Sequence, residues 1–106
     1  MLFYFNPDCP YCKAQLQEII QHRAQFSNTT IYLLSNDPVN VVRAFFNEHQ
    51  LNKYDNFITG VDYSNFLSGY FYITQVPYLA IYDNERRLRE VFIGKTDINI
   101  IKEHFH

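Results

Sequence analysis

The chain contains two cysteines, Cys9 and Cys12, with Pro10 and Tyr11 between them. Two thiols at this spacing suit three kinds of site: part of a metal centre, a structural disulfide, or a dithiol that exchanges electrons with other thiols. A disulfide across this spacing would close a very short loop, so it would remove little entropy from the unfolded chain. The pair is therefore a weak structural crosslink, which favours a chemical role.

The metal and single-cysteine alternatives fit the sequence less well. Structural zinc sites use four ligands in most cases, and this pair supplies two. His22 and His49 are predicted to lie on separate helices at no recognised spacing, and His104 and His106 are close to the C-terminus. A peroxidase centred on one cysteine would not need a second cysteine at this spacing. We therefore predict dithiol–disulfide exchange without a metal, and keep a structural zinc module as an alternative.

A strand and a helix must position Cys9. Residues 2–5 form an apolar run that is typical of a buried strand. A helix is predicted to follow at once, with Asp8 as its cap and Pro10 in its first turn. Its predicted apolar stripe is Leu16, Ile19, Ile20 and Ala24, and its predicted polar face is Gln15, Gln17, Glu18 and Gln21.

This placement gives the two cysteines different roles. At the start of a helix, unpaired N–H groups and the helix dipole favour a thiolate, which is the attacking species in disulfide exchange. We predict that Cys9 is the nucleophile and that Cys12, almost one turn further and deeper, is the resolving cysteine. Asp8 opposes the anion and Lys13 favours it. We expect the helix to dominate, because its N–H groups contact the sulfur directly while both charged side chains stay solvated.

The remaining pattern predicts an α/β domain. Further strands are expected at residues 30–34, 57–61, 76–82 and 88–93, the last two as an antiparallel hairpin in which Asn84 takes any left-handed conformation. Further helices are expected from Asp37 and Pro38, over residues 65–70, and from Thr96 or Asp97. The expected product is a mixed central sheet of about four to five strands with helices on both faces.

Length and charge exclude several classes of function. With 106 residues, the chain is long enough for one domain, residues 1–106, and not for two. A net charge of -2 with mixed signs argues against a nucleic-acid partner, which needs a basic face. No apolar run approaches the roughly 20 residues that cross a bilayer, so we expect no membrane insertion by this segment. The chain opens on a core strand without a lead-in, which suits the C-terminal part of a longer protein.

With these residues in place, the chain resembles the thioredoxin superfamily, and within it the TlpA/ResA-like thiol-disulfide oxidoreductases of bacterial cell envelopes. Residues 5–12, F-N-P-D-C-P-Y-C, are similar to their active-site entry, and Val76-Pro77 is similar to their substrate loop. The resemblance implies that Pro77 is cis and faces the two cysteines, and that the Val76 backbone pairs with an extended substrate. The alternative is that Pro77 merely opens an edge strand.

The resemblance implies exchange with protein thiols and disulfides, in a direction that the sequence does not fix. It implies substrate contacts at Pro10, Tyr11, Val76 and Pro77, and no cofactor besides the redox-active disulfide of Cys9 and Cys12. The C-P-Y-C motif resembles that of glutaredoxins, so glutathione is a weaker second substrate. A non-catalytic peptide-binding module is the other alternative. We expect a monomer and favour the cell envelope over the cytoplasm.

The chain also departs from these relatives at three places. Thioredoxins carry tryptophan where this chain has Asp8, and they bury an aspartate where it has Phe3. The first strand of thioredoxin is expected to be missing. These departures leave the redox strength of the cysteine pair undetermined by the sequence.

Overall fold

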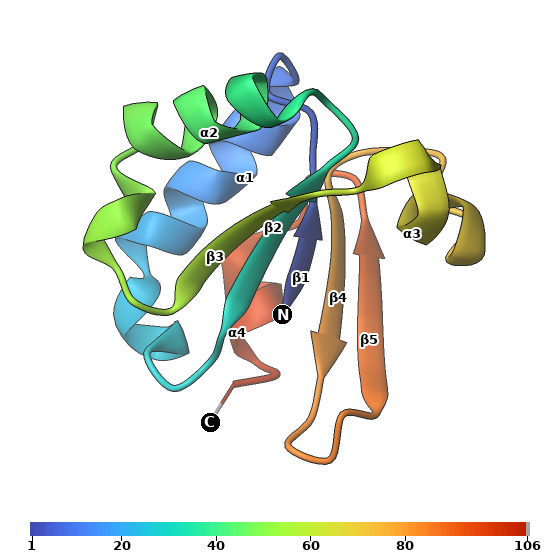
Figure 1. Ribbon diagram of the computed structural model, residues 1–106. Coiled ribbons are helices and arrows are strands. Elements are labelled where there is room, and N and C mark those ends of the chain that lie inside the picture. The colour runs from blue at the N-terminus through green and yellow to red at the C-terminus, as the bar shows by residue number, and fades with distance from the viewer. Residues whose placement is uncertain (106) are drawn as a thin grey trace.

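The computed structural model describes residues 1–105 and shows a central sheet flanked by helices (Figure 1). The strands are β1 (Leu2–Tyr4), β2 (Ile31–Ser35), β3 (Phe57–Val61), β4 (Tyr78–Tyr82) and β5 (Leu88–Ile93). The helices are α1 (Pro10–Gln21), α2 (Val39–Glu48), α3 (Phe66–Tyr70) and α4 (Ile98–Lys102), with short 3-10 turns η1 (Arg23–Phe26), η2 (Leu51–Lys53) and η3 (Tyr63–Asn65).

The five strands lie in the order β3-β2-β1-β4-β5. Strands β1, β2 and β3 are parallel, whereas β4 is antiparallel to both β1 and β5. The carboxyl ends of the three parallel strands therefore share one edge of the sheet, and the chain leaves β1 at that edge to reach the cysteines. The predicted mixed sheet is confirmed.

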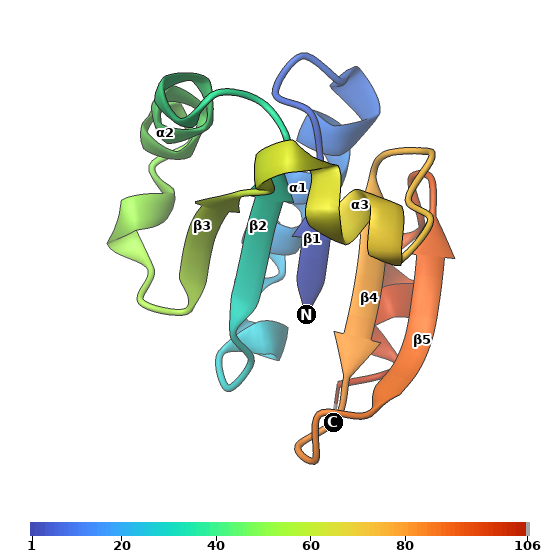
Figure 2. The same cartoon turned by 45° about the vertical axis from the view of Figure 1, so that its right-hand side comes forward.

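Alternating side chains of the strands build a core on each face of the sheet. Phe3 and Phe5 point to the larger core, which α1, α2 and α4 cover. Tyr4, Tyr78 and Ala80 point to the smaller core on the other face, where α3 contributes Leu67. Figure 2 shows α3 in front of the strands and α1 behind them. Helices thus cover both faces, as predicted, but the α3 face has the thinner cover.

The cap of α1 differs from the prediction. Asp8 is exposed, and the N-cap residue is Cys9, with Pro10 in the first helical position. Cys9 has an extended backbone (φ -79°, ψ 115°), and its carbonyl accepts the first helical hydrogen bond, from the N–H of Lys13. The helix therefore begins one residue later than an Asp8 cap requires, and a thiol occupies the position that a carboxylate was expected to fill.

Two residues of α1 and its continuation were assigned to the wrong environment. Gln15, predicted on the polar face, is fully buried, because the segment before α4 lies against it: its Oε1 accepts from the N–H of Thr96 (2.8 Å) and its Nε2 donates to the Thr96 carbonyl (3.1 Å). Ala24, predicted on the apolar stripe, is exposed. The α-helix ends at Gln21, and the following 3-10 turn buries Phe26 instead.

Two turn predictions were also wrong. Asp37 does not cap α2, because its carboxylate accepts a hydrogen bond from the hydroxyl of Ser35 and Pro38 holds the N-cap position without a side-chain bond. In the β4–β5 turn the left-handed residue is Arg86 (φ 63°) and not Asn84. The Asp83 carboxylate sets this geometry, since it accepts two backbone N–H groups further along the turn.

Candidate active site

Cys9 and Cys12 lie together at the start of α1, with different exposure. Cys9 is half-buried, whereas Cys12 is fully buried in the larger core. The backbone N–H of Cys12 donates to the sulfur of Cys9 at 3.2 Å. Both residues are free thiols in this structure. The sulfur of Cys9 thus faces solvent while it accepts a backbone hydrogen bond, and the sulfur of Cys12 lies behind it in the core.

The loop before Cys9 is held by the sheet and the core. The N–H of Phe5 donates to the carbonyl of Leu34 in β2 (3.0 Å), and the N–H of Cys9 donates to the carbonyl of Asn6 (3.0 Å). The ring of Phe5 packs on Phe45 of α2, with centroids 4.8 Å apart. Cys9 is therefore placed by a rigid strand end, although the segment that carries it is a loop.

The Cys12 thiol is strongly biased toward its protonated form. Burial raises its pKa to about 12, and its hydrogen bond with Cys9 acts in the same direction. Phe3, which stands where relatives bury an aspartate, is fully buried within the same core. Phe3 has no group that could accept the proton of Cys12.

Val76 and Pro77 lie at the same edge of the sheet as Cys9. Tyr4 in β1 pairs with Tyr78 in antiparallel β4, so the residues just before Tyr78 run beside the residues just after Tyr4. The Val76–Pro77 peptide bond is cis, and the Pro77 carbonyl accepts a hydrogen bond from the N–H of Gly94 (2.9 Å). Within residues 1–105, neither the N–H nor the carbonyl of Val76 has a hydrogen-bond partner. Val76 thus offers a short free backbone edge near the cysteines.

The other predicted substrate contacts are accessible. Pro10 is exposed, and Tyr11 is 66% exposed between the two cysteines. Asp8 and Lys13 are exposed as well, and neither forms an ion pair within the part of the chain that the structure describes. The structure therefore brings all six predicted site residues to one end of the molecule.

A buried carboxylate at this end was missed in the sequence. Asp62, directly after β3, is 5% exposed and accepts hydrogen bonds from the Tyr4 hydroxyl (2.6 Å) and from the N–H groups of Leu67 (2.8 Å) and Ser68 (3.0 Å). These three bonds outweigh burial and hold the pKa of Asp62 below its usual value. Its only signal in the sequence is an acidic residue between a strand and a predicted helix, which is a common and unspecific pattern.

No metal site is formed by the described residues. Over residues 1–105, no three His, Cys, Asp or Glu side chains gather as a metal would need. His49 is the C-cap residue of α2, and its ring packs on Phe45. His22 is half-buried at the end of α1, with its Nδ1 3.4 Å from the amine of Lys102. No helix in this part of the chain is long and apolar enough to cross a membrane.

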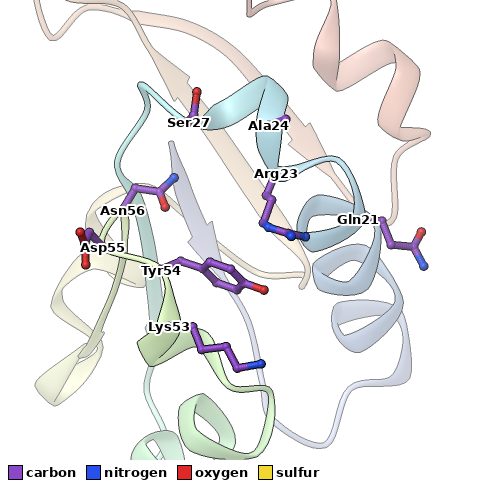
Figure 3. Close-up of a pocket in the computed structure, with 8 residues that line it drawn as sticks. All are labelled: Gln21, Arg23, Ala24, Ser27, Lys53, Tyr54, Asp55 and Asn56. Atoms are coloured by element: carbon purple, nitrogen blue, oxygen red, sulfur yellow. The ribbon is translucent and has the colours of Figure 1, made fainter.

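Figure 3 shows a surface cleft whose lining includes Arg23, Tyr54 and Asn56. Arg23 and Tyr54 meet across it, with the guanidinium carbon 5.1 Å from the ring centroid. The cleft is bounded by η1, η2 and Asn56, whose carbonyl accepts from the N–H of Ile31 at the start of β2. It therefore lies at the amino ends of the parallel strands, opposite the edge that carries Cys9, and has no part in chemistry at the thiols.

Comparisons with known proteins agree with this geometry. The model of the AhpC/TSA family matches residues 1–101. Similar solved structures include a secreted disulfide oxidoreductase of Mycobacterium tuberculosis homologous to E. coli DsbE (TM-score 0.78, 16% identity, covering 96% of this chain and 75% of that one). DsbF of MTB is similar too (TM-score 0.76, 23% identity, covering 96% of this chain and 74% of that one). So is StoA of Bacillus subtilis (TM-score 0.75, 18% identity, covering 96% of this chain and 78% of that one).

A search of curated proteins found no match. The identities to the solved structures are low, so these structures establish the fold, while the family model spans nearly the whole chain. Both lines of comparison agree with the predicted superfamily. The chain belongs to the AhpC/TSA family and has a thioredoxin-like fold.

Proposed function

We propose that this protein is a thiol-disulfide oxidoreductase that exchanges the Cys9–Cys12 dithiol with disulfides of protein substrates. The observation that carries the proposal is the asymmetry of the two thiols. Cys9 is partly exposed and its sulfur accepts a backbone N–H, whereas Cys12 is buried directly behind it. This is the arrangement that an attacking and a resolving thiol require.

In the first step, the Cys9 thiolate attacks one sulfur of a substrate disulfide. A bond forms between Cys9 and that sulfur, the substrate S–S bond breaks, and the other substrate sulfur leaves as a thiolate that takes a proton from water. The N–H of Cys12 supports the anion before attack. The product is a mixed disulfide between Cys9 and the substrate.

In the second step, Cys12 loses its proton and attacks the sulfur of Cys9. The Cys9–Cys12 disulfide forms, and the substrate leaves with its second sulfur as a thiolate that is then protonated. The substrate has gained two electrons from the cysteine pair and two protons from solvent, and Cys12 has lost one proton. The raised pKa of Cys12 keeps this thiol protonated until the mixed disulfide exists. The same steps run backwards when the protein oxidises a substrate.

An extended substrate segment is positioned by the loop at Val76 and Pro77. The free N–H and carbonyl of Val76 pair with its backbone in the manner of an added strand. Pro10 and Tyr11 contact it from the opposite side of Cys9. We propose no cofactor other than the cysteine pair, a monomer as the active form, and glutathione only as a weaker second substrate.

We propose a cell-envelope location and a TlpA-like subtype for this chain. Two similar structures support the location: one is described as secreted and another, from Streptococcus pneumoniae, as an exposed lipoprotein thioredoxin. Each description applies to the protein for which it is given. Fractionation of cells that produce the full-length protein with an epitope tag tests the location.

A trapping experiment tests the proposed reaction. Cys12→Ser retains the attacking thiol and removes the resolving one, so incubation with a disulfide-containing protein is expected to leave a stable mixed disulfide at Cys9. The matched control, Cys9→Ser, is expected to trap nothing, because the remaining thiol is buried. Mass spectrometry identifies the cysteine involved. Failure of Cys12→Ser to trap any protein or peptide disulfide would refute the exchange and leave a peptide-binding module.

A further inference from the structure

Four large aromatic side chains are unusually exposed around α3. Tyr63 is 70% exposed, Phe66 71%, Tyr70 70% and Tyr72 86%, and we call these four residues the aromatic platform. Phe66 and Tyr70 lie one turn apart on α3 with their rings stacked, 6.5 Å between centroids. Exposed apolar groups gathered in this way mark interaction sites more often than scattered single residues do.

The backbone around the platform is strained. Ser64 and Asn65, before α3, and Tyr72, after it, all have left-handed backbones with φ between 55° and 61° and no glycine among them. Such conformations persist only where the surrounding structure enforces them, and they concentrate at functional segments. Before α3, the group that holds the segment is Asp62, whose carboxylate binds two N–H groups of the first turn of α3.

The platform adjoins the proposed active site. The N–H of Asp62 donates to the carbonyl of Ser35 (2.7 Å), which fixes the start of the segment at the carboxyl ends of the parallel strands. That is the edge from which the chain runs to Cys9. At its other end, Tyr72 lies four residues before Val76. Figure 2 shows α3 across the strands at the end of the sheet from which the chain leaves β1.

The chain segment that carries the platform has almost no charge. Across residues 56–82, the only charged residue is Asp62, and it is buried. A folded protein surface or a nucleic acid would meet no complementary charge here. Membrane-surface helices set lysine and arginine beside their aromatic residues, and this segment has neither. The chemistry therefore suits an uncharged chain with apolar and aromatic side chains.

A second copy of this protein is the other candidate occupant. Two further exposed apolar side chains lie at the active-site end: Tyr11 (66% exposed) between the cysteines, and Ile93 (62%), which pairs with Tyr78. A partner copy that covered the platform and Tyr11 together would also cover Cys9. A substrate chain, by contrast, must reach both the platform and Cys9 at once.

We infer that the aromatic platform is a docking surface for an unfolded polypeptide rich in apolar and aromatic residues, and that it selects such chains as substrates of Cys9. The inference rests on the proposed exchange at Cys9 and deepens it. Substrate residues on one side of the disulfide pair with Val76, and residues beyond them lie on the platform. A substrate with polar residues at those positions reacts at Cys9 without this additional binding.

The test compares two synthetic peptides of equal length, each closed by one disulfide. One carries Phe, Tyr and Leu beside the disulfide, and the other carries Ser, Asn and Gln. The platform variant is Phe66→Ser/Tyr70→Ser/Tyr72→Asn, where Asn is chosen because it tolerates the left-handed backbone. The control variant, Ile100→Ser, removes another exposed apolar side chain (47% exposed) from α4, on the other face of the sheet.

We expect the platform variant to reduce the apolar peptide about tenfold more slowly than the wild type, in keeping with the loss of several aromatic contacts. Its rates with the polar peptide and with hydroxyethyl disulfide are expected to stay unchanged, and Ile100→Ser is expected to change none of the three. Circular dichroism checks the fold, and the single variant Tyr72→Asn, expected to slow the apolar peptide about threefold, serves if the triple variant does not fold.

Several outcomes would overturn the inference. Equal rates for both peptides in wild type and variant would show that the platform does not select substrates, while exchange at Cys9 would stand. If light scattering finds a dimer for the wild type and a monomer for the platform variant, the platform is a contact between two copies. If the wild type binds phosphatidylcholine vesicles and the platform variant does not, the platform is a membrane contact. If no peptide is reduced at all, the fluorescence anisotropy of a labelled, disulfide-free apolar peptide separates the two hypotheses. Binding to the wild type that is lost in the platform variant would support the docking surface and refute the exchange at Cys9. No binding to the wild type would refute both.

Discussion

Replacing Asp62 by asparagine tests how the α3 segment is held. The side chain keeps its shape and loses its charge. Asp62 accepts three hydrogen bonds, from Tyr4, Leu67 and Ser68. Hydrogen bonds to a charged group contribute about 1.5–3 kcal/mol each. Asparagine retains one acceptor oxygen and turns an NH2 donor toward the remaining donors, so we expect the free energy of unfolding to fall by about 2–4 kcal/mol at pH 7.

That loss is a large share of the roughly 5–15 kcal/mol that stabilises a domain of this kind. It corresponds to a decrease in melting temperature of about 10–20 °C. The assay is urea unfolding followed by circular dichroism. Asp55→Asn is the matched control, because Asp55 is exposed, and it is expected to change stability by less than about 0.5 kcal/mol.

The pH dependence separates charge from shape. The pKa of Asp62 is lower in the folded protein than the roughly 3.9 of an unfolded chain, so its ionised form stabilises the fold fully above that value. The contribution is lost as the pH falls through the folded pKa. The difference between wild type and Asp62→Asn should therefore shrink as the pH falls below the roughly 3.9 of the unfolded chain. A difference that is constant from pH 7 to this acid range, or absent at pH 7, would refute the reasoning.

Three further outcomes are expected. Gln15→Ala should lower the free energy of unfolding by about 2–3 kcal/mol in urea titrations, because it removes two hydrogen bonds from a buried position, whereas Gln21→Ala on the exposed face should change it little. Arg86→Gly should stabilise the protein by about 0.5 kcal/mol, since glycine relieves the left-handed backbone, and Arg86→Asn should gain less; a loss of stability would contradict this. Iodoacetamide at pH 8 should alkylate Cys9 in the native protein and reach Cys12 only after unfolding, because Cys12 is buried and its pKa is raised to about 12; equal labelling of both cysteines would contradict the assigned roles.

The sequence predicted the architecture well because the architecture depends on local patterns. The run at residues 57–61 became β3 without change, and the last helix, expected from Thr96 or Asp97, has Asp97 as its N-cap residue. The position of Cys9 followed from a strand that runs directly into a helix. The cis bond at Pro77 was implied by family resemblance and by no local pattern.

The errors arose where distant parts of the chain meet. Gln15 has the pattern of a surface residue, and it is buried by a loop 81 positions away. The structural role of Asp62 depends on its hydrogen bond with Tyr4, which lies 58 positions away in the sequence. The N-cap of α1 is Cys9 and not Asp8, because Cys9 still has an extended backbone and the helix begins at the next residue. Amphipathic periodicity contains no information about such contacts.

The burial of Cys12 has an electrochemical consequence. Because its thiol holds a proton up to a pKa of about 12, closing the proposed disulfide releases that proton together with two electrons at every physiological pH. Each proton that a two-electron couple releases on oxidation shifts its midpoint potential by about 30 mV for each pH unit, and Cys12 contributes one such proton. The pair would become a stronger reductant in alkaline surroundings and a stronger oxidant in acidic ones. In two compartments of different pH, the Cys9–Cys12 pair would thus have different midpoint potentials, and the pH difference between the compartments would set the difference in potential.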